Sequence, residues 1–430
     1  MWGIADCDNC FVSCERVFRP DLNGKPVVVL SNNDGCVVAR SNEAKALGVK
    51  MGLPYFQMRQ MFGDNAVTAF SSNYELYGDM SDRIMSILRH EAPVVVQYSI
   101  DEAFLDLHGL DASRLKGWGE WLSAKIYQWT DMPVSIGIAP TKTLAKVASR
   151  FAKRFPQYNK CCMMASESER VAMLKATSID DVWGIGRRWG DKLSRMGFAT
   201  ALDFANADRQ WVRREMHITG ERTYRELHGE DCVDIDSHDA PRHSICTSRS
   251  FPVMTADIET LRTYTSNFAA HCAQKLRRQR SVASMVTVAI DTNRFRPDLP
   301  QYGQSASLPL TTPSDATIEI VSTAAKALDI IFRKGFLYKR AAVIVTGVES
   351  NSAVQTDFTS YDPEQRRKMR RIDQAMSAIN RRMGADTVIL GSQQYAATDP
   401  DGKHITFANS IRRALKSPSY TRNPNDFKIK

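Results

Sequence analysis

Residues 94–107 read VVVQYSIDEAFLDL, in which two apolar runs flank two consecutive acids, Asp101 and Glu102. Runs rich in β-branched and aromatic residues predict two strands that meet near these acids. Adjacent residues on a regular strand face opposite sides, so the two carboxylates can share a site only at a turn. Charge inside an apolar hairpin is costly unless it is paired or bound to metal. The stretch therefore predicts a hairpin with a functional carboxylate pair.

A third acid, Asp6, lies near the polar end of a short strand predicted within residues 1–10. Phosphoryl transfer between nucleotides uses one metal ion to activate the attacking hydroxyl and a second to hold the triphosphate. Magnesium prefers carboxylate oxygens, phosphates and water, so two or three acids suffice. Taken singly, each acid is better explained as a solvent-facing strand end.

The rest of the chain divides into blocks of mixed composition. The first block is α/β or α+β, and its further predicted elements are strands at 26–30 and 133–138, a turn followed by a short strand within 32–40, and helices at 41–47, at 118–129 and from 141. A helical block follows over 167–229, then a polar linker at 234–243. Residues 244–348 form a second α/β unit with a basic face that includes Lys275, Arg277, Arg278 and Arg280.

The tail contains one well-marked helix, with Asp362 as the N-cap, Pro363 in the first turn and Gly384 at the end. Its apolar positions recur at spacings of three and four: Met369, Ile372, Met376, Ile379 and Met383. Arginines lie between them. We expect a packed helix with a solvated basic face, in preference to a dedicated binding helix.

Composition limits the class of protein. The chain has 430 residues, 43% hydrophobic, with a formal net charge of +9, which predicts about three domains and suits a polyanionic partner. No apolar run is long enough for a membrane helix, so we expect a soluble, cytoplasmic protein with no membrane partner. Cys7, Cys10 and Cys14 lack a fourth ligand nearby, so buried thiols are favoured over a zinc or iron–sulfur site.

Motifs along nearly the whole chain resemble the Y-family DNA polymerases, most closely those of the UmuC type. They are GKPVVVLSNNDGCVVAR (24–40), EAKALGVKMG (43–52), FSSNYELYGDMS (70–81), YSIDEAF (98–104), TKTLAK (141–146), DDVWGIGRR (180–188), SRSF (248–251), YGQSAS (302–307) and SPSYT (417–421). The resemblance implies that Asp6 and Asp101 contact both of two Mg²⁺ ions, with Mn²⁺ as an alternative. It implies that Glu102 contacts the ion nearer the primer hydroxyl and that the Cys7 carbonyl adds a supporting contact.

The resemblance also implies a nucleotide site. Lys142 matches a lysine that reaches the incoming triphosphate, Lys45 stands where many relatives have arginine, and Asn42 stands where some have tyrosine. Phe11 occupies the position that senses the sugar. Cys10 departs from the family, which usually has an aromatic residue there.

The implied fold is α+β and multidomain, a right-handed polymerase. Its parts are a palm (1–20 and 70–165), fingers (21–69), a thumb with a helix-hairpin-helix (166–233), a little finger (244–350) and a C-terminal extension (351–430). Glycines at a helix N-terminus let backbone N–H groups approach a phosphate. The residues expected to contact DNA are Gly184, Gly186, Arg187, Arg188 and Arg249.

The implied function is low-fidelity translesion DNA synthesis in DNA repair and the SOS response, with primer–template DNA and dNTPs as substrates. A processed UmuD-type dimer, a recombinase filament and a sliding clamp are further implied partners, and the location is the cytoplasm at the nucleoid. Gln355 and Phe358 fit a short clamp-docking peptide about as well as a plain linker. The alternatives are a catalytically weak DNA-bound regulatory subunit and another two-metal enzyme such as a nucleotide cyclase.

Overall fold

The protein's structure is a computed structural model that describes residues 1–235, 241–352, 362–394, 411–418 and 420. The chain forms two compact units, residues 1–240 with 413–430 (unit 1) and residues 241–412 (unit 2). Part of the predicted linker, residues 236–240, lies outside the described residues, as do Gln355 and Phe358. No helix within the described ranges is long and apolar enough to cross a membrane.

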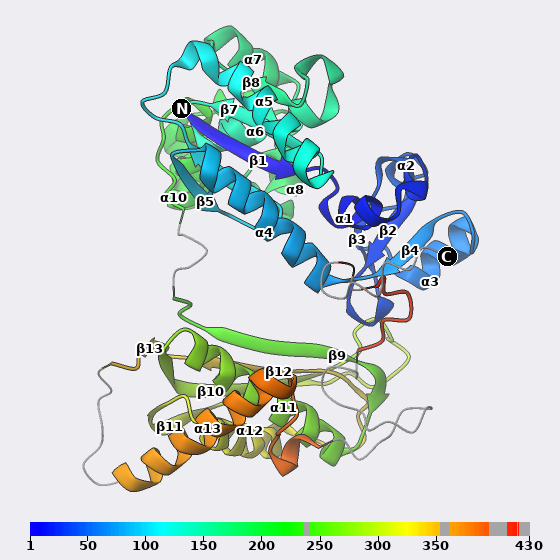
Figure 1. Ribbon diagram of the computed structural model, residues 1–430, viewed down its shortest axis with the longest axis vertical. Coiled ribbons are helices and arrows are strands. Elements are labelled where there is room, and N and C mark those ends of the chain that lie inside the picture. Colours follow the sequence, from blue (N-terminus) through cyan, green and yellow to red (C-terminus); the bar gives the residue numbers. More distant parts are fainter. Residues whose placement is uncertain (236–240, 353–361, 395–410, 419, 421–430) are drawn as a thin grey trace. The chain divides into compact units, whose positions relative to one another are not determined.

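Unit 1 is built on a five-stranded sheet with the order β5-β6-β1-β7-β8 (Figure 1). Its central strand, β1, pairs antiparallel with β6 and with β7, and β8 is parallel to β7. The strands are β1 (Trp2–Cys7), β5 (Val94–Gln97), β6 (Glu102–Asp106), β7 (Val134–Ala139) and β8 (Cys161–Met163). The predicted meeting of two strands within residues 94–107 is confirmed.

The two faces of this sheet carry different helices because side chains alternate along each strand. Ala5 and Leu105 belong to the core that packs under α4 (Tyr74–Glu91) and α5 (Ala112–Thr130). Ile4 and Phe104 belong to the core under α6 (Lys142–Arg154). Helix α6 lies so close that a Cβ on Gly137 of β7 would fall 2.1 Å from a backbone oxygen of the helix. Every second residue of β1 and β6 therefore faces α6.

The remainder of unit 1 consists of a small sheet and a helical block. The small sheet has the order β3-β2-β4 and follows α1 (Cys10–Phe18). Its elements are β2 (Val27–Leu30), β3 (Val37–Arg40), α2 (Asn42–Ala46), α3 (Tyr55–Phe62) and β4 (Thr68–Ser71). The helical block contains α7 (Glu167–Lys175), η4 (Ile179–Asp181), α8 (Arg187–Arg195), α9 (Ala201–Ala205) and α10 (Arg209–Leu227). The helical prediction for residues 167–229 is confirmed.

Unit 2 is an antiparallel sheet of order β11-β10-β12-β9, with helices α11 and α12 packed on it around one core. The strands are β9 (Ile245–Thr255), β10 (Ser281–Thr292), β11 (Gly303–Ser314), β12 (Tyr338–Thr346) and β13 (Glu349–Ser350), which pairs with β10. The helices are α11 (Ile258–Arg278), α12 (Thr317–Ile331) and α13 (Pro363–Met383). The second α/β unit is as predicted.

Helix α13 begins and ends as predicted, with Asp362 as its N-cap. The predicted packing face is only partly correct, because Met369 and Met376 are half-buried but Ile372, Ile379 and Met383 are 36%, 39% and 70% exposed. The buried residue of the helix is Asp373, which accepts a 3.1 Å hydrogen bond from the Thr317 backbone N–H at the start of α12. An acid that caps another helix can decide which face of a helix is buried, and apolar spacing does not reveal such a contact.

Candidate active site

Three acids gather where β1 ends and β6 begins. Asp6 is the direct partner of Glu102 across the two antiparallel strands. Asp101 occupies the turn before β6, where its carbonyl accepts a 2.9 Å bond from the Cys7 N–H. The Ser99 hydroxyl holds this turn, since it accepts from the Glu102 N–H at 3.0 Å and donates to Asp101 Oδ1 at 2.5 Å. The predicted turn brings the acids together.

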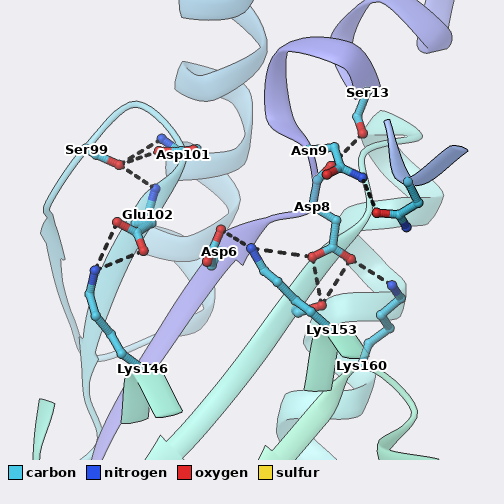
Figure 2. Close-up of polar contacts among 12 residues, drawn as sticks. Asp6, Asp8, Asn9, Ser13, Ser99, Asp101, Glu102, Lys146, Lys153 and Lys160 are labelled. Atoms are coloured by element: carbon cyan, nitrogen blue, oxygen red, sulfur yellow. Dashed lines mark hydrogen bonds and ion pairs between the residues drawn. The ribbon is translucent and has the colours of Figure 1, made fainter. Parts of the chain in front are cut away.

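Two lysines from α6 neutralise these acids (Figure 2). Asp6 and Glu102 lie on the α6 face of the sheet because each is two residues from an inward residue, Ile4 or Phe104. Lys153 forms an ion pair with Asp6, and Lys146 Nζ lies 3.0 Å from Glu102 Oε1. Two ammonium groups thus occupy positions beside the carboxylates where cations are stable.

The electrostatics of the cluster favour a bound cation. The pKa of Asp6 is raised from 3.8 to about 6, mainly by burial and also by the charges of Glu102 and Asp101, while Lys153 opposes the shift. Burial opposes the charge of Lys153, but the carboxylates of Asp6 and Asp8 outweigh that effect and raise its pKa. The ionised acids repel one another, so added positive charge is the direct way to stabilise them.

Asp8 is a fourth acid at the site, which the sequence analysis missed. Its carboxylate accepts from the Ser135 hydroxyl at 2.9 Å and from Lys160 Nζ at 2.7 Å, and Lys153 Nζ lies 3.7 Å away (Figure 2). Asp8 follows Asp6 by two residues, which is the spacing of one strand face. This spacing of two residues is the feature of the sequence that could have identified Asp8 as a site residue.

The donor set fits hard divalent cations, which take oxygen ligands and complete their shells with water and phosphate. Within the described ranges, no group of three or more His, Cys, Asp or Glu side chains is arranged as a preformed metal cage. Asp6 and Glu102 contact lysines instead. Cys7, Cys10 and Cys14 are buried free thiols, as expected.

The expected nucleotide-site residues form a second group beside the acids. Lys45 Nζ lies 2.6 Å from Asn9 Oδ1 and 3.2 Å from Asn42 Oδ1. Asn9 directly follows Asp8, so the contact joins α2 to the end of β1. Phe11, on α1, stacks on Tyr77 with ring centroids 4.5 Å apart.

Lys142 is separated from the acids. Its Nζ donates to Asp231 at 2.6 Å and lies 3.8 Å from the centre of the Trp2 ring, at the opposite end of β1 from Asp6. Four residues of strand span roughly 13 Å. The structure brings Lys146 and Lys153 to the acids instead. Their spacing from Lys142, four and eleven residues, places all three on one face of α6, and that periodicity was the missed signal.

The residues expected to contact DNA lie in two places, at the start of α8 in unit 1 and on strand β9 in unit 2. Gly184 has a φ of +95°, a conformation that favours glycine, and a Cβ there would fall 2.4 Å from Thr223 Oγ1. Gly186 is the N-cap of α8, so Arg187 and Arg188 form its first turn. Arg249 lies on β9 of unit 2, opposite Ala341 of β12.

Comparison with known proteins agrees with this geometry. The profile of the impB/mucB/samB family matches residues 5–150, and that of the family's C-terminal domain matches residues 242–358. The chain is 37% identical to Protein UmuC of Salmonella typhimurium strain LT2, over 99% of both chains. The chain belongs to the impB/mucB/samB family.

More distant relatives extend the comparison. The chain is 29% identical to a DNA polymerase IV of Corynebacterium diphtheriae, over 74% of this chain and 69% of the relative. A solved Y-family DNA polymerase chimera, Dbh-Dpo4(243-245)-Dbh, superposes with a TM-score of 0.67 at 21% identity, covering 82% of this chain and all of that chain. The resemblance to UmuC-type proteins and the multidomain polymerase fold are confirmed. A nucleotide cyclase is not favoured.

Proposed function

We propose that this family member is a template-directed DNA polymerase for translesion synthesis, which adds dNTPs to a primer 3′-hydroxyl. The observation that carries the proposal is the cross-strand pair Asp6 and Glu102 with Asp101 in the adjoining turn. Phosphoryl transfer depends on positioning and on neutralising charge, and a carboxylate cluster facing a row of lysines suits both. The chain's full-length likeness to UmuC supports the same activity.

The acids are proposed to hold two Mg²⁺ ions, or Mn²⁺, which would activate the primer hydroxyl and neutralise the triphosphate. Asp6 and Asp101 are assigned to both ions, Glu102 to the ion nearer the primer, and the Cys7 carbonyl to a supporting contact. The donors fit, since each acid supplies carboxylate oxygens. The ammonium groups beside Asp6 and Glu102 show that these positions accept positive charge. Cation binding would free Lys146 and Lys153 from these ion pairs.

Lys153 is proposed as the residue that reaches the triphosphate. It pairs with Asp6 and lies near Asp8, so its ammonium group becomes available at the acid site once cations neutralise those carboxylates. Lys142, the residue expected from the motif, pairs with Asp231 at the other end of β1. Lys45 and Asn42 are proposed to bind phosphate oxygens from the α2 side.

Phe11 is proposed to exclude ribonucleotides. It lies five residues after Asp6, and its ring is fixed against Tyr77. An aromatic ring at the sugar would clash with a 2′-hydroxyl and offer it no hydrogen-bond partner. The two effects together favour deoxyribonucleotides by roughly a hundredfold or more.

The DNA contacts are proposed to be sequence-independent. The Gly184–Gly186 turn with Arg187 and Arg188 would bind backbone phosphates from the thumb, and Arg249 would do so from the little finger. The domain bounds are those given by the family resemblance: palm 1–20 and 70–165, fingers 21–69, thumb 166–233, little finger 244–350, extension 351–430. A UmuD-type dimer, a recombinase filament and a clamp bound through Gln355 and Phe358 complete the proposed partners, at the nucleoid in the cytoplasm.

Primer extension with purified full-length protein tests the proposal. Undamaged and abasic templates are compared with and without the UmuD-type dimer and the recombinase filament. Extension past the abasic site by the wild type, and none by Asp101→Ala, is the expected result. Extension by neither protein under any condition would leave the regulatory, catalytically weak subunit as the better assignment.

A further inference from the structure

The C-terminal segment of the chain docks back onto unit 1. We call residues Arg413–Pro418 together with Tyr420 the strap. Ser71, the last residue of β4, forms a parallel bridge with Lys416, and its N–H donates to the Leu415 carbonyl at 3.0 Å. The Leu415 N–H in turn donates to the Ser71 hydroxyl at 2.9 Å. The backbone of Leu415 thus holds the strap to the small sheet through two hydrogen bonds to Ser71, across 344 residues of sequence.

Ser417 is the innermost polar residue of the strap among those described, being 6% exposed. Its hydroxyl accepts a 2.9 Å bond from Asn73 Nδ2, and Asn73 is fully buried. Asn73 is also the N-cap of α4, through its side-chain oxygen. A buried amide that serves both contacts is costly to leave half satisfied, so the strap and the start of α4 stabilise each other.

Ser417 also reaches α1, the helix that carries Phe11. The Ser417 hydroxyl donates to Glu15 Oε1 at 3.0 Å, and the Tyr77 hydroxyl donates to the same oxygen at 2.7 Å. Glu15 is fully buried, and among the described residues its Oε2 has no hydrogen-bond partner. Burial raises the pKa of Glu15, and the two hydroxyls oppose that shift. Ser417 therefore supplies one of the two hydrogen bonds that offset the cost of burying the Glu15 carboxylate.

The same acid is linked to Phe11. Tyr77 is fully buried, and its ring stacks on Phe11 with an interplanar angle of 14°. Phe11, Glu15 and Phe18 follow one another on α1 at spacings of four and three, which places them on one helix face. Tyr420 of the strap stacks on Phe18, with centroids 4.6 Å apart. The strap thus contacts this face of α1 at Glu15 and Phe18, one and two turns beyond Phe11.

We propose that the strap positions Phe11 through Ser417, Glu15 and Tyr77, so that the C-terminal end of the chain helps set the choice between deoxyribonucleotides and ribonucleotides. This inference rests on the proposed role of Phe11 as the sugar gate. A gate that works by volume is sensitive to small displacements, because a gap of 0.5–1 Å already removes about a quarter to a half of a van der Waals contact. Ser417, Glu15 and Tyr77 are positioning residues and do not touch the substrate.

The test is the ratio of kcat/KM for a dNTP to that for the matching rNTP, on one template with the full-length protein. A loss of folded protein cancels in this ratio, because both substrates are measured on the same enzyme. Ser417→Ala and Tyr77→Phe are expected to lower the ratio about threefold to tenfold, the factor that one net hydrogen bond corresponds to. Glu15→Gln keeps an acceptor oxygen and should stay closer to the wild type. Ser322→Ala, an exposed serine on α12 of unit 2, is the matched control and should leave the ratio unchanged.

A double variant separates this inference from the gate itself. If Ser417 acts through Phe11, then Ser417→Ala should change the ratio no further in the Phe11→Ala background. A lowered ratio in Phe11→Ala with wild-type ratios in Ser417→Ala and Tyr77→Phe would overturn the strap inference and leave the gate standing. An unchanged ratio in Phe11→Ala would overturn the gate, and the strap inference with it.

Discussion

Asp6 and Glu102 are direct partners across the β1–β6 pair, and each contacts a different lysine of α6. Two acids opposite each other on neighbouring strands repel, and that repulsion destabilises a sheet. Lys146 and Lys153 offset this repulsion. The arrangement explains how the two acids can lie side by side without destabilising the sheet.

Replacing Asp6 should stabilise the metal-free protein while removing its activity. The pKa of Asp6 rises from 3.8 in the unfolded chain to about 6 on folding, and this shift already includes the attraction of Lys153. An acid whose pKa is raised by folding costs nothing below pH 3.8, and its cost grows until about pH 6. Asp6→Asn should therefore match the wild type near pH 3.5 and exceed it above pH 7 by at most about 3 kcal/mol.

Denaturant unfolding in a chelator, from pH 3.5 to 8, measures this difference. Asp106→Asn is the control on the neighbouring strand, because hydrogen bonds and the charge of His108 hold the pKa of Asp106 below its usual value against the effect of burial. That variant should lose stability at pH 8. An Asp6→Asn protein that is less stable than the wild type at pH 8 would show that Lys153 more than compensates the buried carboxylate.

Lys153 and Lys142 should differ in their effect on nucleotide binding. Lys153→Met removes the ammonium group nearest Asp6 and should raise KM for the incoming dNTP about tenfold, as expected for a lost charge-assisted bond to phosphate. Lys142→Met should leave KM unchanged and lower stability, since it breaks the contact with Asp231. Steady-state kinetics of both variants measure these KM values. A raised KM in Lys142→Met with an unchanged KM in Lys153→Met would show that Lys142 binds the triphosphate.

Phe11→Ala should raise ribonucleotide incorporation far more than it changes deoxyribonucleotide incorporation. The smaller side chain removes the clash with the 2′-hydroxyl, whereas a dNTP presents only hydrogen there. The expected fall in the dNTP-to-rNTP ratio is roughly a hundredfold. Single-nucleotide incorporation with each substrate measures it. Phe18→Ala, two turns along α1, shows how much comes from loosening the helix and its contact with Tyr420 of the strap.

Local sequence predicted the acids and their supporting turn. The apolar residues around Asp101 required a hairpin, and the structure has one, held by Ser99. Lys153 shares one face of α6 with Lys142, so its spacing was a usable signal, but which carboxylates that face meets depends on the strands that α6 covers. Two other features depend on contacts far apart in sequence. Ser417 lies in a motif recognised from the sequence, yet its partner Glu15 is 402 residues away. The buried face of α13 is centred on Asp373, a residue that the apolar spacing does not include.

Asp6, Asp101 and Glu102 are proposed to drive nucleotide addition. Single-turnover incorporation of one dNTP on a bound primer–template, with Mg²⁺, measures this in Asp101→Ala, with Asp106→Asn as the control from the far end of β6. We expect a loss of about a thousandfold or more in rate for Asp101→Ala, an unchanged rate for the control, and similar DNA affinity for all three proteins. A rate for Asp101→Ala within about tenfold of the wild type would exclude Asp101 from the reaction, because loss of a metal contact costs far more than that.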